Sequence, residues 1–171
     1  LRCAALGLLA VAFARPFRRI SGAGEQRTIA VVIDDSLSMQ AGHRWEAARA
    51  WVHDKVGDVG SVDHLGLLAL TPTPRWVTPL STPADVALKK LDALQPGWGT
   101  AHAEPGLRMA ADALANVAAD NRVLVFMGDH QRLTWNGFDF NRPLATGVRP
   151  VFPPLADAVK RQAQLLPPAI E

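Results

Sequence analysis

The chain has 171 residues, of which 49% are hydrophobic and 20% are charged, so it can bury a core and is not a disordered chain. Its single Cys excludes a disulfide scaffold and a Cys-based zinc cluster. The formal net charge is +2, but residues 1–20 hold four Arg and no acid, and without them it becomes −2. Because no basic stripe interleaves with aromatic residues, a nucleic-acid partner is not expected.

An uncharged apolar run at residues 3–14 is followed at once by Arg15, Arg18 and Arg19. These twelve residues are fewer than the roughly 20 that a helix needs to cross a bilayer. We interpret residues 1–20 as the end of a transmembrane helix whose first part is missing here; a signal peptide and a buried helix are the alternatives. The arginines favour the cytoplasmic side for the residues after them. We expect a linker at 21–27, a domain at 28–166 and a tail at 167–171.

The domain begins with a buried strand, because residues 28–33 are a continuous β-branched run. Predicted strands and helices follow this strand along the chain. The sequence predicts a helix at 44–56, a strand at 65–70, a proline-flanked edge strand at 75–78, a helix at 82–94, a loop at 96–100, a helix at 104–118, strands at 122–127 and 148–152, and a helix near 155–165.

This alternation indicates an α/β fold with a Rossmann-like, doubly wound, mostly parallel sheet and one short antiparallel edge strand. Ligands of such sheets bind beyond the carboxyl ends of the strands. Asp34 and Asp129 stand at two of these ends, Ser36 and Ser38 follow Asp34 at alternate positions, and Thr100 lies among glycines. All five side chains offer oxygen, which suits a hard divalent cation, Mg²⁺ or Mn²⁺.

The pattern Asp34-x-Ser36-x-Ser38, with Gly99-Thr100 and Gly128-Asp129 after it, resembles the metal-ion-dependent adhesion site (MIDAS) of von Willebrand factor type A domains. The resemblance covers about residues 28–152. It implies that the two Ser hydroxyls ligate the metal directly, that the Thr ligates directly or through water, and that the two Asp hold metal-bound waters or ligate directly. It further implies a protein-binding module and not an enzyme, in which a partner's Asp or Glu completes the metal coordination.

Several details resemble bacterial aerotolerance membrane proteins of the BatA type: an apolar segment ending in Ala-Arg-Pro at 14–16, Arg-Trp-Glu at 44–46 and Asp129-x-Gln131-Arg132. This resemblance implies a bacterial membrane location through the N-terminal segment. It also implies partners such as a MoxR-type AAA+ ATPase or other Bat-like proteins. The chain departs from the family at Trp98, which separates two glycines where the family often has Gly-Gly-Thr, and at 130–147, where the family usually has a helix.

Alternative interpretations fit the sequence less well. A magnesium-dependent phosphohydrolase of haloacid-dehalogenase type would use Asp34 as nucleophile, but it needs an acid at position 36, which is Ser. Serine-hydrolase and nucleotide-loop motifs do not occur. The Asp-x-Ser-x-Ser segment could also be a turn and helix cap without metal. We expect Asp35 to face solvent or pair with an Arg, and either Trp98 or Trp135 to be an exposed interaction anchor.

Overall fold

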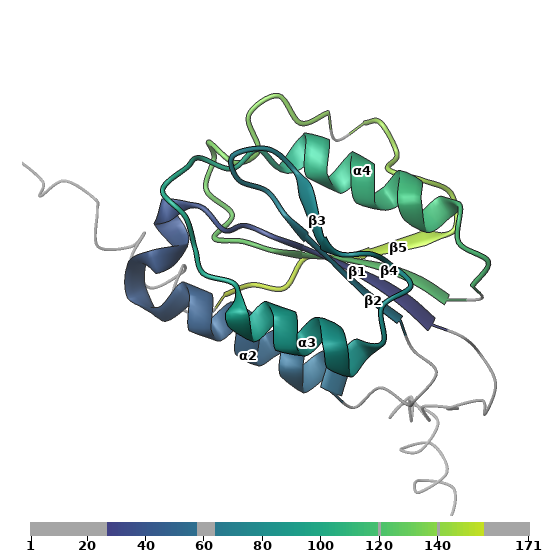
Figure 1. Ribbon diagram of the computed structural model, residues 1–171. Helices are drawn as coiled ribbons and strands as arrows, with labels where there is room; N and C mark the ends of the chain where they lie inside the picture. The colour runs from purple at the N-terminus through teal and green to yellow at the C-terminus, as the bar shows by residue number, and fades with distance from the viewer. Residues whose placement is uncertain (1–26, 58–63, 120, 140, 156–171) are drawn as a thin grey trace, which may run out of the picture.

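A computed structural model of the chain describes residues 27–57, 64–119, 121–139 and 141–155 (Figure 1). The predicted membrane segment at 1–20 and the tail at 167–171 lie outside these residues. So does the helix near 155–165, apart from its first residue. Within the described part of the chain, no helix is both long enough and apolar enough to span a bilayer.

The described residues form one five-stranded sheet in the order β3-β2-β1-β4-β5. Neighbouring strands are parallel except β3, which pairs antiparallel with β2 at the edge of the sheet. This arrangement confirms the predicted fold class, including the antiparallel edge. The strands are β1 (Arg27–Ile33), β2 (His64–Ala69), β3 (Arg75–Thr78), β4 (Asn121–Met127) and β5 (Val148–Val151).

Helices cover both faces of the sheet, as Figure 1 shows: α2 (Arg44–Gly57) and α3 (Ala84–Ala93) on one face, and α4 (Ala103–Ala115) on the other. Strand β1 is apolar at successive positions because both faces are covered. Val31 packs in the core under α2 and α3, whereas Val32 packs in the core under α4. Burial of both faces explains why the strand lacks an alternating polar pattern.

Helix α4 lies close to the sheet at Gly106, which is fully buried within it. A Cβ atom at this position would come within 2.2 Å of Leu70 Cδ2 and 3.3 Å of Leu68 Cδ2. The glycine therefore allows the helix to approach the strands more closely than any side chain would permit. This packing fixes the start of α4, directly after the loop that carries Thr100.

The parallel register brings the ends of two central strands together. Ile33 of β1 pairs with Met127 of β4, and the next amide, Asp34 N–H, donates to the Met127 carbonyl at 2.8 Å. Between β4 and β5, the described residues of segment 130–147 form turns and no helix, as the weak helical pattern of this segment predicts. The carboxyl edge of the sheet is thus built from the connections after β1, after α3 and after β4.

Candidate metal centre

Three connections meet at the carboxyl edge of the sheet, and backbone hydrogen bonds join them. The first, after β1, passes into a 3₁₀ segment, η1 (Leu37–His43). The Leu37 N–H donates to the Gly99 carbonyl at 3.2 Å, and the Gly97 N–H donates to the Asp35 carbonyl at 2.6 Å. These bonds bring the Asp-x-Ser-x-Ser segment and the Thr100 loop side by side, although they lie more than 60 residues apart in sequence.

The three predicted hydroxyls share one cavity. Its volume is about 260 Å³, and Ser36, Ser38 and Thr100 line it together with apolar and amide groups. The Ser36 and Ser38 hydroxyl oxygens are 3.0 Å apart. Ser36 is buried, Ser38 is half-buried and Thr100 is exposed, so the hydroxyls lead from the protein interior to its surface. The structure therefore brings together all three hydroxyls that the sequence singles out.

Asp34 lies beside this cavity, completely buried at the end of β1. One carboxylate oxygen, Oδ1, accepts the Ser36 N–H at 2.9 Å, while the other, Oδ2, is buried without a hydrogen-bond partner among the described residues. Burial raises the pKa of this carboxyl above its ordinary value of 3.8. Hydrogen bonds from Ser36 lower the pKa in part, and the charges of Asp129 and Asp35 raise it again. The Asp34 N–H donates to the carbonyl of Met127, two residues before Asp129, so the two predicted carboxylates lie at neighbouring strand ends.

Asp129 follows β4 and is also buried. Its Oδ1 accepts the Gln131 N–H at 3.1 Å, and its Oδ2 accepts a hydrogen bond from Arg44 Nη1 at 3.0 Å. The same Arg44 nitrogen donates to the Ser38 carbonyl at 3.1 Å. Arg44 thus joins the connection after β1 to the connection after β4, and all five predicted residues meet at one place in the fold.

The expectation that Asp35 faces solvent is wrong, whereas the expected pairing with an Arg is present. Asp35 is only 2% exposed, and its Oδ1 accepts the N–H groups of Leu70 and Thr71 at 3.1 and 2.8 Å. Its Oδ2 forms an ion pair with Arg75 at 3.2 Å. Asp35 therefore points away from the cavity and holds the end of β2 against the first connection.

Sequence reasoning misses two residues that organise the centre. Gln40 donates from Nε2 to the Pro96 and Gly97 carbonyls at 3.3 and 3.1 Å, which fixes the loop that carries Thr100. Arg44 enters the sequence argument only as part of a family pattern. A cation in the first turn of a helix is unfavourable against the helix dipole, and this position could have indicated a local carboxylate partner.

The donor set suits a hard divalent cation. Among the described residues, no three His, Cys, Asp or Glu side chains are placed to hold one metal ion together, so a site of the zinc-finger kind is not available there. The cavity instead offers hydroxyl oxygens beside two buried carboxylates, and carboxylates and hydroxyls are the ligands that Mg²⁺ and Mn²⁺ prefer. The unpartnered Oδ2 of Asp34 fits this chemistry, because a buried carboxylate oxygen normally has a donor or a cation beside it.

The fold and the arrangement of these residues define the class. Residues 29–131 match the von Willebrand factor type A domain family, and the chain belongs to that family. The resemblance seen in the sequence is thereby confirmed. No curated protein gave a significant match.

Solved structures share the fold. BatB from Bacteroides thetaiotaomicron is 17% identical with a TM-score of 0.63, over 75% of this chain and 65% of that one. The von Willebrand factor domain of the type V pili tip protein Mfa5 from Porphyromonas gingivalis is 26% identical with a TM-score of 0.51, over 61% and 38%. Proximal thread matrix protein 1 from the mussel byssus, described with a zinc-occupied MIDAS motif, is 19% identical with a TM-score of 0.54, over 75% and 37%. The chain thus spans between 37% and 65% of the length of these proteins.

Proposed function

We propose that the chain is a divalent-metal-dependent protein-binding module, which engages an Asp or Glu side chain of a partner protein. The observation that carries this proposal is the shared cavity of Ser36, Ser38 and Thr100 beside two buried carboxylates. The hydroxyls and the carboxylates of Asp34 and Asp129 would hold Mg²⁺ or Mn²⁺. The zinc-occupied MIDAS motif of the mussel protein supports a divalent cation at this place in the fold.

The charges around the cavity support an acidic partner. Asp34 and Asp129 contribute two negative charges when both are ionised, and Arg44 contributes one positive charge. A divalent cation would therefore leave the centre with one uncompensated positive charge. When bound, the cation would act as a Lewis acid that attracts a carboxylate. An Asp or Glu from a partner protein would both neutralise the centre and add an oxygen ligand.

The residues that line the cavity support binding rather than turnover. Among the described residues, the cavity wall contains hydroxyl, amide, glycine and apolar groups, with no Lys, His or carboxylate side chain. A phosphohydrolase that uses Asp34 would need a reactive carboxylate open to the substrate, but this side chain is buried and accepts the Ser36 N–H. The cavity thus offers no group placed to protonate a leaving group.

We further propose that residues 28–166 form the domain and that residues 1–20 tether it to a bacterial membrane. The apolar run at 3–14 and the arginines after it support the tether. The resemblance to aerotolerance proteins supports partners such as a MoxR-type AAA+ ATPase or other Bat-like proteins. Membrane fractionation tests the tether: the full chain should sediment with membranes, and a chain without residues 1–20 should not.

Metal titration tests the central proposal. Isothermal titration of Mn²⁺ or Mg²⁺ into the full chain in detergent should show one site, and Thr100→Ala should weaken it by about 10-fold or more. Thr146→Ala is the matched control, because Thr146 is also an exposed Thr but lies outside the cavity. Equal affinity in the wild type and Thr100→Ala contradicts the proposal. Turnover of p-nitrophenyl phosphate that disappears in Asp34→Ala would instead favour the phosphohydrolase.

A further inference from the structure

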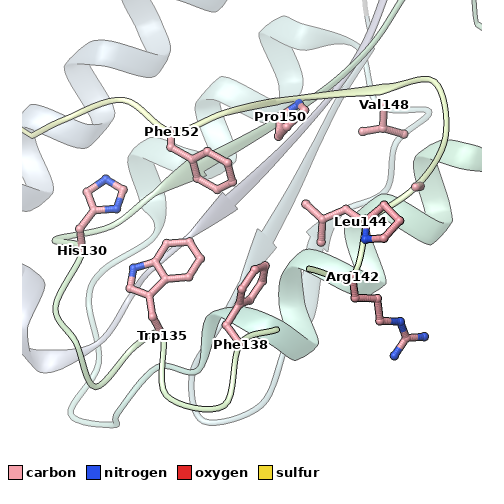
Figure 2. Close-up of a pocket in the computed structure, with 10 residues that line it drawn as sticks. His130, Trp135, Phe138, Arg142, Leu144, Val148, Pro150 and Phe152 are labelled. Carbon is pink, nitrogen blue, oxygen red and sulfur yellow. The ribbon is translucent and has the colours of Figure 1, made fainter. Parts of the chain in front are cut away.

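An apolar groove lies along β5, next to the metal centre (Figure 2). Its volume is about 620 Å³, within the range of roughly 300–1,000 Å³ that is typical of ligand-binding pockets. Figure 2 shows the rings of Trp135, Phe138 and Phe152 as neighbours in one cluster. Leu144, Val148 and Pro150 line the groove together with these rings. Part of the groove lining comes from segment 130–147, whose described residues form turns and no helix.

Aromatic packing holds the groove open in a defined shape. The Trp135 ring is central: its centroid lies 4.9 Å from that of Phe126, 5.2 Å from that of Phe138 and 5.8 Å from that of Phe152. Phe126 belongs to β4 and is completely buried, so the cluster is anchored in the core of the domain. In contrast, Phe152 is 42% exposed. The groove is therefore preformed, with an aromatic surface available to a partner.

One loop, residues 130–135, contributes side chains to both the groove and the metal cavity. Leu133 and Thr134 line the metal cavity, while Trp135, the next residue, lines the groove. Leu133 is 55% exposed and Leu37, which also lines the metal cavity, is 45% exposed. Large exposed apolar side chains on a soluble domain often mark an interaction surface. Here both line the metal cavity, and Leu133 belongs to the loop that also contributes Trp135 to the groove.

Charge favours an acidic partner at the groove as well. The groove lining includes Arg142 and His130 and no carboxylate side chain among the described residues. Figure 2 shows the Arg142 side chain extending away from the aromatic rings, at the edge of the groove. The metal centre also calls for an acidic side chain. One acidic and apolar segment would therefore satisfy both places.

We propose that the groove is the second half of the partner-binding surface. It receives an aromatic or large aliphatic side chain from the same segment of the partner protein that presents an Asp or Glu to the metal. Because adjacent residues of one loop, Thr134 and Trp135, line the two cavities, we expect only a few residues of the partner between the acid and the apolar side chain. This inference rests on the proposed metal-dependent function and adds the feature that selects the partner.

Peptide selection on the full chain tests the proposal. The probe is a library of twelve-residue peptides with one fixed central Asp and random flanks, selected in Mn²⁺. Enriched peptides should carry Trp, Phe or Leu at a constant offset from the Asp. Fluorescence polarisation should show that Phe152→Ser weakens binding of such a peptide by about 10- to 100-fold. Val86→Ser is the matched control, because Val86 of α3 has the same 42% exposure and lies outside the groove.

A second variant distinguishes loss of the groove from misfolding of Phe152→Ser. Ala145 lines the groove, and Ala145→Trp should fill it and weaken binding by a similar factor while leaving the aromatic cluster in place. Two results would overturn the groove proposal and leave the proposed function standing. In the first, the enriched peptides need metal but have no preferred apolar residue at a fixed distance from the Asp. In the second, they bind both groove variants with the affinity of the wild type. If enriched peptides bind equally with and without a chelator, or none is enriched, the proposed function fails and the link between groove and metal fails with it.

Discussion

Asn in place of Asp34 should have opposite effects on stability with and without metal. Without metal, the ionised carboxylate is buried, has an oxygen with no hydrogen-bond partner among the described residues, and lies near two other acids. Asn removes this buried charge and keeps the side-chain carbonyl that accepts the Ser36 N–H. We therefore expect Asp34→Asn to be more stable than the wild type in a chelator at pH values above the raised pKa of Asp34, and to gain little from metal.

The size of each effect can be worked out from general magnitudes. An unsatisfied buried polar group destabilises a fold by about 1–3 kcal/mol, and a charged one by more; Asn leaves a buried amide at the Oδ2 position but removes the charge, so we take about 1 kcal/mol as the gain. For a chain of this length, 1 kcal/mol corresponds to a shift in Tm of about 2–4 °C. Metal at 100 times its Kd stabilises the wild type by about 2.7 kcal/mol, or about 5–11 °C. With a gain of about 1 kcal/mol, the variant should melt about 2–4 °C above the wild type in a chelator and below the wild type in metal at 100 times the wild-type Kd.

The raised pKa of Asp34 determines how the free energy of unfolding should change with pH. The pKa of Asp34 is higher in the folded chain than its ordinary value of 3.8, so the folded chain binds more protons in that range. The free energy of unfolding without metal should therefore fall as pH rises from 3.8 through the raised pKa. The stabilisation that metal adds should grow over the same range, because metal binds the ionised carboxylate. In Asp34→Asn, the contribution of this group to both trends should be absent.

Differential scanning fluorimetry across pH, in chelator and in Mn²⁺, measures all of these quantities. Asp35→Asn is the neighbouring control, since Asp35 has hydrogen-bond and ion-pair partners for both oxygens and should not be stabilised by the change. A variant Asp34→Asn that melts below the wild type in the chelator would refute the argument from buried charge.

Three further changes test the surrounding structure. Asp35→Ala removes the acceptor of the Leu70 and Thr71 N–H groups at the end of β2 and the ion pair with Arg75. Urea unfolding should show a free energy of unfolding lower by about 3 kcal/mol, with or without metal. A loss that occurs only in the presence of metal would contradict this role. Arg44→Met leaves the buried charge of Asp129 without its ion-pair partner. Thermal melts should show a lower Tm in a chelator than for the wild type, and a larger rise in Tm on adding Mn²⁺. A rise in Tm equal to that of the wild type would contradict this role of Arg44. Gly106→Ala forces a clash between α4 and the sheet, and urea unfolding should show a free energy of unfolding lower by about 1–3 kcal/mol. An unchanged free energy of unfolding would mean that α4 can shift away from the sheet without loss of stability.

The sheet and the position of the five candidate ligands could be predicted from the sequence because local patterns determine them. A continuous β-branched run such as residues 28–33 indicates a strand covered on both faces, and parallel strands end at one edge. Asp34 and Asp129 therefore had to lie near each other once β1 and β4 were neighbours. Their role as metal ligands stays a prediction, which the titration addresses.

The parts that could not be predicted depend on contacts between distant segments. Asp35 follows the end of β1, where strand alternation no longer sorts side chains, and its partners lie at the end of β2. The start of α3 differs from the prediction for a similar reason: Thr82 has the side chain of a helix cap, but Pro83 precedes the first helical residue and the Thr82 hydroxyl donates to the Pro79 carbonyl. The groove cannot be seen in the sequence because segment 130–147 has no hydrophobic period that assigns its side chains to a face.

Three backbone hydrogen bonds hold the connections of the candidate metal centre together. The N–H groups of Asp34, Leu37 and Gly97 donate to the carbonyls of Met127, Gly99 and Asp35, in that order. Their atoms are backbone amides and carbonyls, so a cation supplies none of these bonds. A cation would accordingly enter an environment in which little conformational entropy is left to lose. We therefore expect folding and ion binding to be separable events, unlike those of small domains that fold only around their metal. Exchange of one divalent ion for another should leave the secondary structure of the domain unchanged.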